Sequence, residues 1–162
     1  ESIIVNVQGD EPLIAPRLIT QVAELLHASK QVDIATLCEP IADAKDVFDP
    51  GIVKVVRDAK DRALYFSRAP IPWDRSAFDL DRKNLPDGQT YYRHLGIYAY
   101  RASYLLEFVK LPSCRIERIE SLEQLRALYN GGHILAADAL EQSGPGVDTQ
   151  SDLDRVRRLA GD

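Results

Sequence analysis

The sequence predicts an α/β fold of three layers, in which a mixed, mostly parallel sheet lies between helices. Short runs rich in β-branched residues alternate with amphipathic stretches near both ends of the chain, and this alternation is typical of such folds. In the middle of the chain, two short apolar runs flank a polar turn, which predicts a hairpin within the same sheet. With 162 residues, the chain suits one domain over residues 1–162 with a single hydrophobic core.

Each expected strand is a short run of β-branched and aromatic residues that ends in turn-forming residues. The run IIVNV, for example, leads into Gln8, Gly9 and Asp10, and the segment DAKDR separates the two runs of the hairpin. After the hairpin, residues 69–90 combine prolines and charges without periodicity, which predicts a long loop of the kind that often has a function. The expected strands cover residues 2–8, 33–38, 52–58, 63–67, 91–100 and 133–139.

Each expected helix carries apolar residues at intervals of three and four, which would form one buried stripe. Pro16 suits the first turn of the first helix, and Thr149 with Asp152 resembles a capping box before the last one. The expected helices cover residues 16–30, 41–48, 102–110, 117–130 and 150–160. In the fourth of these helices, the expected apolar stripe consists of Ile119, Leu122, Leu125, Leu128 and Tyr129.

The composition is typical of a globular protein and disfavours several other classes. The net charge of −5 and the isoelectric point near 5.2 disfavour nucleic acids and anionic membranes as main partners, because both attract basic surfaces. Cys38 and Cys114 are far apart and have no metal-ligand spacing, so we expect a reducing compartment, the cytoplasm, rather than a disulfide framework. No apolar run reaches the length of a membrane span.

Two aspartates are expected at the edge of the sheet where α/β folds bind ligands, beyond the carboxyl ends of the strands. Asp10 follows the first strand in the motif QGDEP, and Asp148 precedes the last helix in GPGVDT. A carboxylate at a strand end can bind Mg²⁺ together with substrate phosphates. Either aspartate can also serve only in a turn or as a helix cap, and the pattern leaves both interpretations open.

A second candidate group lies in the strand sequence HLGIY. His94, Gly96 and Tyr98 alternate with core-like residues and therefore share one face of the strand. Two polar aromatic side chains on either side of a glycine would leave a notch in which a ligand could lie. The alternative is an edge strand with a glycine bulge. By the same alternation, Gln8 shares a face with Asp10 at the end of the first strand.

Three further polar residues have both a functional and a structural interpretation. Arg68 follows a strand and precedes a proline-containing segment, so its planar guanidinium could recognise a carboxylate or phosphate, or form a surface ion pair. Glu123 and Gln124 fall between Leu122 and Leu125, where a solvent-exposed helix face is the simpler interpretation.

Taken together, several motifs of the chain resemble one family, the 3-deoxy-manno-octulosonate cytidylyltransferases, also called CMP-KDO synthetases. The matching segments follow the family order across nearly the whole chain. They are VNVQGDEPLI at 5–14, VKVVRDAKDRALYFSRAPIPWDR at 53–75, RHLGIYAYR at 93–101, IERIESLEQLRALYNGGHI at 116–134 and PGVDTQSDLDRVR at 145–157.

This resemblance implies the nucleotide-diphospho-sugar transferase fold and a CTP-dependent enzyme. The family joins CTP to 3-deoxy-manno-octulosonate (KDO), an eight-carbon sugar acid, and gives CMP-KDO and pyrophosphate for lipopolysaccharide biosynthesis. Asp10 and Asp148 resemble the family's catalytic ligands of Mg²⁺, and Arg68 with His94 would suit the carboxylate of the substrate. A cytoplasmic homodimer is implied, with no nucleic acid or membrane as partner. The residues that resemble the lining of the sugar-acid pocket are Gln8, Arg68, His94, Tyr98, Glu123 and Gln124.

One part of the family pattern has no counterpart in residues 1–162. It is the N-terminal portion, whose basic, glycine-bearing loop resembles a triphosphate cradle. We therefore expect an N-terminally truncated form of the fold that does not catalyse the reaction by itself. Two alternatives remain open: a cytidylyltransferase for another sugar acid, such as an amino-KDO or a sialic acid, and a non-catalytic fragment that binds sugar or forms dimers.

Overall fold

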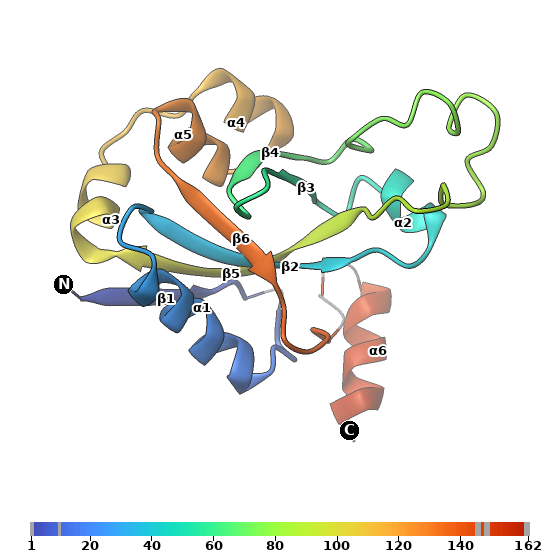
Figure 1. The fold of residues 1–162 in the computed structure, drawn as a ribbon. Coiled ribbons are helices and arrows are strands. Elements are labelled where there is room, and N and C mark those ends of the chain that lie inside the picture. Colours follow the sequence, from blue (N-terminus) through green and yellow to red (C-terminus); the bar gives the residue numbers. More distant parts are fainter. Residues whose placement is uncertain (1, 10, 145–146, 148–149, 161–162) are drawn as a thin grey trace.

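The computed structural model describes residues 2–9, 11–144, 147 and 150–160, which form a six-stranded sheet with helices on both of its faces (Figure 1). The strands are β1 (Ile3–Val7), β2 (Ile34–Pro40), β3 (Lys54–Arg57), β4 (Ala63–Ser67), β5 (Tyr92–Arg101) and β6 (Ile134–Asp138). The helices are α1 (Pro16–Ala28), α2 (Ala44–Phe48), α3 (Ala102–Phe108), α4 (Arg115–Glu120), α5 (Gln124–Tyr129) and α6 (Gln150–Ala160).

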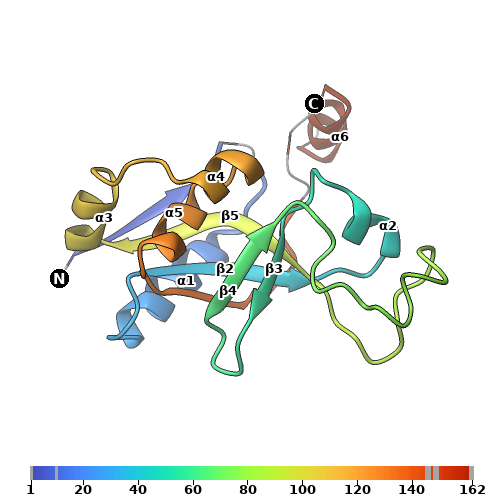
Figure 2. The same cartoon turned by 90° about the horizontal axis from the view of Figure 1, so that it is seen from above.

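Strand β5 is the central strand and is paired along both edges (Figure 2). Strand β2 follows one edge, while β3 and β1 share the other, with β3 near the start of β5 and β1 near its end. Among the described pairings, only β2 with β6 is parallel. The predicted mixed α/β fold is confirmed, but the prediction of a mostly parallel sheet is wrong. The chain enters β5 from a long loop instead of a crossover helix, and this connection allows antiparallel pairing.

The three predicted layers are present because the sheet buries apolar side chains on both faces. On one face, Leu18, Val22 and Leu26 of α1 form a buried cluster with Leu37 of β2 and Ile97 of β5. These three helical residues are spaced by four, so they form one stripe along α1.

The opposite face of the sheet is covered by α3, α4 and α5 (Figure 2). Phe108 and Leu125 from these helices belong to a second buried cluster, which also contains Phe66 of β4 and Tyr98 and Tyr100 of β5. The predicted hairpin is confirmed, since β3 and β4 pair as antiparallel neighbours.

The predicted helix over residues 117–130 is instead two short helices, α4 and α5. Ser121 ends α4 in the left-handed conformation, with φ of 53° and ψ of 49°, and this breaks the helical path. As a result, the predicted stripe is not continuous: Leu125 is buried, whereas Ile119 and Tyr129 are 68% and 63% exposed. The break places residues 121–124 at the ends of two helices, where their side chains are not confined to one helix face.

Residues 69–90 form the predicted long loop and contain neither helix nor strand. The loop is anchored by Phe78, which is almost fully buried. Its ring packs on Phe48 of α2 at a centroid distance of 4.9 Å, and on Tyr91 and Trp73 at 5.4 Å each. Aromatic packing, rather than regular hydrogen bonding, therefore holds this loop against α2.

Helix α6 spans the predicted residues 150–160, and Val156 is buried, as the helical pattern requires. Thr149, the first residue of the predicted capping box, lies outside the described residues.

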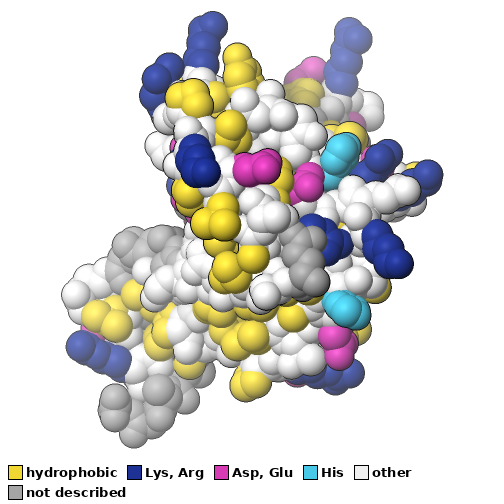
Figure 3. All heavy atoms as spheres, turned by 90° about the vertical axis from the view of Figure 1, so that its left-hand side faces the viewer, with side chains coloured by type: hydrophobic (Ala, Val, Ile, Leu, Met, Phe, Trp, Pro, Cys, Tyr) yellow, Lys and Arg dark blue, Asp and Glu magenta, His cyan; other side chains and the backbone are white. Residues whose placement is uncertain are grey.

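The face that contains α3 combines apolar and charged groups (Figure 3). Hydrophobic side chains gather along its middle, and Lys and Arg side chains lie mainly nearer its margins. Leu106 and Val109 near the end of α3 and Ile119 of α4 are exposed. Within the described part of the chain, no helix has the length and apolar character to cross a membrane.

We predict that Leu37→Ala lowers the free energy of unfolding by about 2–5 kcal/mol, because it leaves a cavity in the cluster between α1 and the sheet. Urea denaturation monitored by circular dichroism measures this loss. The matched control is Leu64→Ala in β4, which removes the same atoms from a residue that is 59% exposed. The control should change stability by only about 0.5 kcal/mol. Equal losses for the two variants would contradict the assigned core.

Candidate functional site

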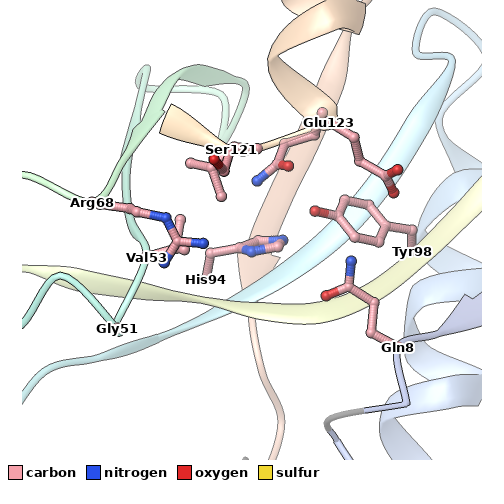
Figure 4. A pocket seen from close by; sticks show the side chains of 10 residues that line it. Gln8, Gly51, Val53, Arg68, His94, Tyr98, Ser121 and Glu123 are labelled. Atoms are coloured by element: carbon pink, nitrogen blue, oxygen red, sulfur yellow. The ribbon is translucent and has the colours of Figure 1, made fainter. Parts of the chain in front are cut away.

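A pocket of about 400 Å³ opens among the ends of β1 and β4, the middle of β5 and the junction of α4 with α5. Figure 4 shows that the side chains of Gln8, Arg68, His94, Tyr98 and Glu123 converge on it from these elements. All six residues that the sequence predicted for one pocket line this space. The complete lining consists of Gln8, Gly51, Val53, Arg68, His94, Tyr98, Ser121, Leu122, Glu123 and Gln124.

Gln8 occupies the space beside Gly96, so a side chain at position 96 would displace it. The backbone N–H of Gln8 donates to Gly96 O at 2.9 Å, which extends the pairing of β1 with β5. A Cβ atom at position 96 would lie 2.7 Å from Gln8 Oε1 and 3.2 Å from Glu11 Cγ. The Glu11 carboxylate also accepts a hydrogen bond from the Gly96 N–H at 3.3 Å. The predicted notch over Gly96 is therefore filled by Gln8 and Glu11. In this position, Gln8 becomes part of the pocket lining.

His94 and Tyr98 project from the same face of β5, as the alternation predicted, with ring centroids 5.2 Å apart. The ring of Phe66 meets His94 edge-on at 5.0 Å. Burial among these groups lowers the pKa of His94 from 6.5 to about 3, so its imidazole is neutral at pH 7. A neutral imidazole forms no ion pair with a carboxylate. A contact with a carboxylate would then be a hydrogen bond from a ring N–H, and the carboxylate-binding role that the resemblance implied for His94 stays a prediction.

Arg68 directly follows β4, and backbone carbonyls fix its guanidinium. Its Nε donates to Glu120 O at 2.8 Å and its Nη1 donates to Pro50 O at 2.9 Å. The backbone N–H of Arg68 donates to the Glu120 carboxylate at 2.9 Å. None of the ion pairs among the described residues involves the Arg68 guanidinium. Its charge thus remains available to an anion, and its planar fork suits a carboxylate or phosphate.

Lys54 is fully buried and holds the wall of the pocket on which Arg68 lies. Its ammonium donates to the carbonyl oxygens of Asp49, Ile52 and Arg68 at 2.5–2.7 Å. These three bonds use all three hydrogens of the ammonium. Burial lowers the pKa of Lys54 to about 8, against the opposing charge of Asp49. Lys54 therefore ties the loop that contains Gly51 to the backbone of Arg68.

The junction of α4 and α5 supplies the remaining polar groups of the pocket. Glu123 is exposed at the junction, while Gln124 is only 4% exposed. The described residues give the Gln124 amide no hydrogen bond. Its amide atoms are not among the fully buried polar atoms left without a partner, so they are reached from the pocket, where a ligand hydroxyl could bind them. Of the two interpretations of Gln124, the solvent-exposed helix face does not hold, because this residue follows the break at Ser121, is buried and lines the pocket, as the resemblance implied.

The predicted metal ligands, Asp10 and Asp148, lie outside the described residues. In the chain, Asp10 stands two residues after the pocket residue Gln8. The part of the chain that the structure describes contains no group of three or more His, Cys, Asp or Glu side chains able to hold a metal ion. The assignment of Mg²⁺ to the two aspartates stays a prediction.

Three residues that support the pocket were not recognised in the sequence. Lys54 does carry a signal, since it interrupts the apolar run IVKVV and a lysine inside a strand needs hydrogen-bonding partners. Glu120, whose carboxylate accepts from the Ser67 hydroxyl at 2.6 Å, looks like any polar residue of an amphipathic helix. Glu11 carries no signal in the sequence, because only the fold brings its carboxylate to the Gly96 N–H of β5.

Comparison with known proteins identifies a family. A family model described as cytidylyltransferase matches residues 1–137. The chain is 57% identical over 160 residues to a 3-deoxy-manno-octulosonate cytidylyltransferase of Nitrosococcus oceani. It is 56% identical over 159 residues to that of Pseudomonas fluorescens. Both matches cover 98% of this chain, but 62% and 63% of the two relatives.

A solved structure leads to the same group of proteins. It is that of a CMP:2-keto-3-deoxy-manno-octonic acid synthetase complexed with CTP, which is 40% identical in sequence and superposes with a TM-score of 0.85. The match covers 98% of this chain and 61% of that one. The chain therefore spans less than two thirds of the length of the proteins it matches.

We predict that His94 destabilises the fold in acid. Because its pKa is lower in the folded state, the unfolded state binds the extra proton between pH 6.5 and about 3. The free energy of unfolding should therefore decrease as the pH is lowered through this interval. The contribution of His94 to this decrease is at most about 1.4 kcal/mol per pH unit. Replacing His94 by Gln, which does not titrate, should make the loss shallower in urea denaturation curves recorded between pH 4 and 7.

The control for this measurement is Thr20→Val on the exposed side of α1, which changes no titratable group and should keep the wild-type pH dependence. Contributions from carboxylates are common to all three proteins and cancel in the comparison. An unchanged slope in the His94 variant would show that the histidine is not buried in its neutral form.

Proposed function

The chain belongs to the cytidylyltransferase family, and from this premise we propose that it serves the coupling of CTP to KDO, with CMP-KDO and pyrophosphate as products. The observation that carries the proposal is the pocket, in which one guanidinium that forms no ion pair with a described residue faces several uncharged hydrogen-bonding groups. A sugar acid has the complementary pattern of one carboxylate and several hydroxyls.

In this proposal, Arg68 binds the carboxylate of the sugar acid. Its guanidinium is already oriented by Glu120 O and Pro50 O, so little side-chain entropy is lost on binding. The neutral side chains of Gln8, His94 and Gln124 then face the hydroxyls, and Glu123 can accept from a hydroxyl at the rim.

The reaction requires a hydroxyl of the sugar to attack the α-phosphate of CTP, and both substrates are anions. Positioning and charge neutralisation account for most of the catalysis in such transfers. Asp10 and Asp148 would supply two carboxylates, a ligand type that suits Mg²⁺, and the ion would neutralise the triphosphate and polarise the α-phosphate. The contribution of the pocket is to hold the sugar acid in one orientation, with its carboxylate on Arg68.

The proposal also includes a role in lipopolysaccharide biosynthesis, a location in the cytoplasm and assembly as a homodimer. The free, buried thiols of Cys38 and Cys114 are compatible with a reducing compartment. The acidic net charge supports small-molecule substrates rather than nucleic acid or anionic membrane as partners. For the dimer, the exposed apolar residues Trp73 and Leu80 make the long loop a candidate surface.

We further propose that residues 1–162 bind the sugar acid without turning it over. Among the described residues that line the pocket, Arg68 is the single basic side chain besides the neutral His94, and it cannot serve both a carboxylate and a triphosphate. Titration with KDO, an amino-KDO and a sialic acid would rank the three candidate substrates. Binding without turnover would also fit a non-catalytic sugar-binding fragment, whereas sustained pyrophosphate release from CTP and KDO would contradict the proposed inactivity.

We predict that Arg68→Gln weakens KDO binding by the polypeptide of residues 1–162 by about ten- to a hundredfold, because it removes a charge-assisted hydrogen bond. Isothermal titration calorimetry provides the measurement. The matched control is Arg118→Gln, which removes the same charge from an exposed position on α4. Wild-type affinity for KDO in the Arg68→Gln variant would contradict the proposal that Arg68 binds the carboxylate.

A further inference from the structure

Behind the pocket, the side chain of Thr36 on β2 touches the ring of His94 (Oγ1 to Nε2, 2.9 Å). We propose that Thr36 is a positioning residue that keeps the ring proton of His94 on Nε2, so that Nδ1 is an acceptor reserved for a hydroxyl of the bound sugar. The part of this inference that concerns the sugar rests on the proposed function, while the part that concerns the ring proton does not.

The direction of the Thr36–His94 hydrogen bond follows from counting hydrogens. Thr36 is fully buried, and its hydroxyl has one hydrogen to donate. The hydroxyl lies 2.7 Å from Ile97 O and 3.3 Å from Leu95 O. Carbonyl oxygens only accept, so the hydrogen goes to the nearer of them, Ile97 O. The contact with His94 then requires a donor on the histidine, and Nε2 must carry the proton.

An irregularity in the sheet creates this arrangement. Along β2, Thr36 is paired with Tyr98, but its neighbour Leu37 is paired with Leu95. Two residues of β5, Gly96 and Ile97, are therefore extra relative to β2 and form a bulge. A bulge interrupts the ladder of backbone hydrogen bonds, and the Thr36 hydroxyl supplies a donor to the carbonyls there. The bulge thus contains Gly96, beside which Gln8 lies, and it also brings Thr36 to His94.

A single proton on the ring leaves the other nitrogen as an acceptor. The ring is flanked by the aromatic rings of Phe66 and Tyr98, and burial holds it neutral. Its Nδ1 forms no hydrogen bond with any described residue, while His94 lines the pocket. A lone pair in this position attracts a hydroxyl and repels a carboxylate. His94 therefore selects a hydroxyl and Arg68 selects the carboxylate of the same ligand. These two contacts fix the orientation of a sugar acid in the pocket.

The test combines a spectroscopic measurement with a binding measurement on ¹⁵N-labelled protein of residues 1–162. Long-range ¹H–¹⁵N spectra report which nitrogen of each histidine is protonated, and the His94→Gln variant assigns the signal. We expect the Nε2–H form in the wild type. Thr36→Ser, which keeps the hydroxyl, should retain this form, and Thr36→Val should lose it in favour of a mixture. Thr20→Val on the exposed side of α1 is the control.

For KDO, we expect Thr36→Val to bind about three- to tenfold more weakly, with wild-type affinity restored in Thr36→Ser. A proton on Nδ1 in the wild type, or an unchanged Nε2–H form in a folded Thr36→Val variant, would overturn the inference. If the valine variant does not fold, the wild-type and serine spectra still decide it. If no variant binds KDO but the spectra agree with expectation, the proposed function fails and the positioning role of Thr36 is supported.

Discussion

The absence of a side chain at position 96 is the constraint on which the pocket depends. A methyl group there would lie 2.7 Å from the amide oxygen of Gln8, so any larger residue would displace Gln8 and press on Glu11. The same position belongs to the bulge of β5 opposite Thr36 and Leu37. One glycine therefore allows two strands to deliver polar side chains to one space: β1 delivers Gln8, and β5 delivers His94 and Tyr98.

A buried lysine gives the opposite wall its shape and contributes to its charge. Removing an ammonium from water costs several kcal/mol unless hydrogen bonds replace its hydration. Lys54 meets this requirement with three carbonyl oxygens, one of which belongs to Arg68. In its protonated form, the side chain adds a second positive charge behind the guanidinium of Arg68. The wall is thus both rigid and positive, whereas the neutral His94 makes the adjoining floor suitable for uncharged groups.

The sequence predicted which residues line the pocket better than it predicted the contacts and chain path that bring them together. The alternation of side chains along a strand was sufficient to group His94 with Tyr98, because it depends only on local geometry. It could not predict that Gln124 is buried, since the break at Ser121 is invisible to helical periodicity. Thr36 is an ordinary strand residue until the register shift of β5 brings it to His94. The direction of β5 was missed because strand–helix alternation says nothing about a strand that follows a loop.

The central claim is that a sugar acid lies in this pocket with its carboxylate on Arg68 and a hydroxyl on His94. A crystal structure of residues 1–162 soaked with KDO tests it most directly. The account predicts a carboxylate oxygen about 2.7–2.9 Å from the Arg68 guanidinium, together with a sugar hydroxyl within hydrogen-bonding distance of His94 Nδ1. A carboxylate bound at His94, or a sugar bound outside the pocket, would contradict it.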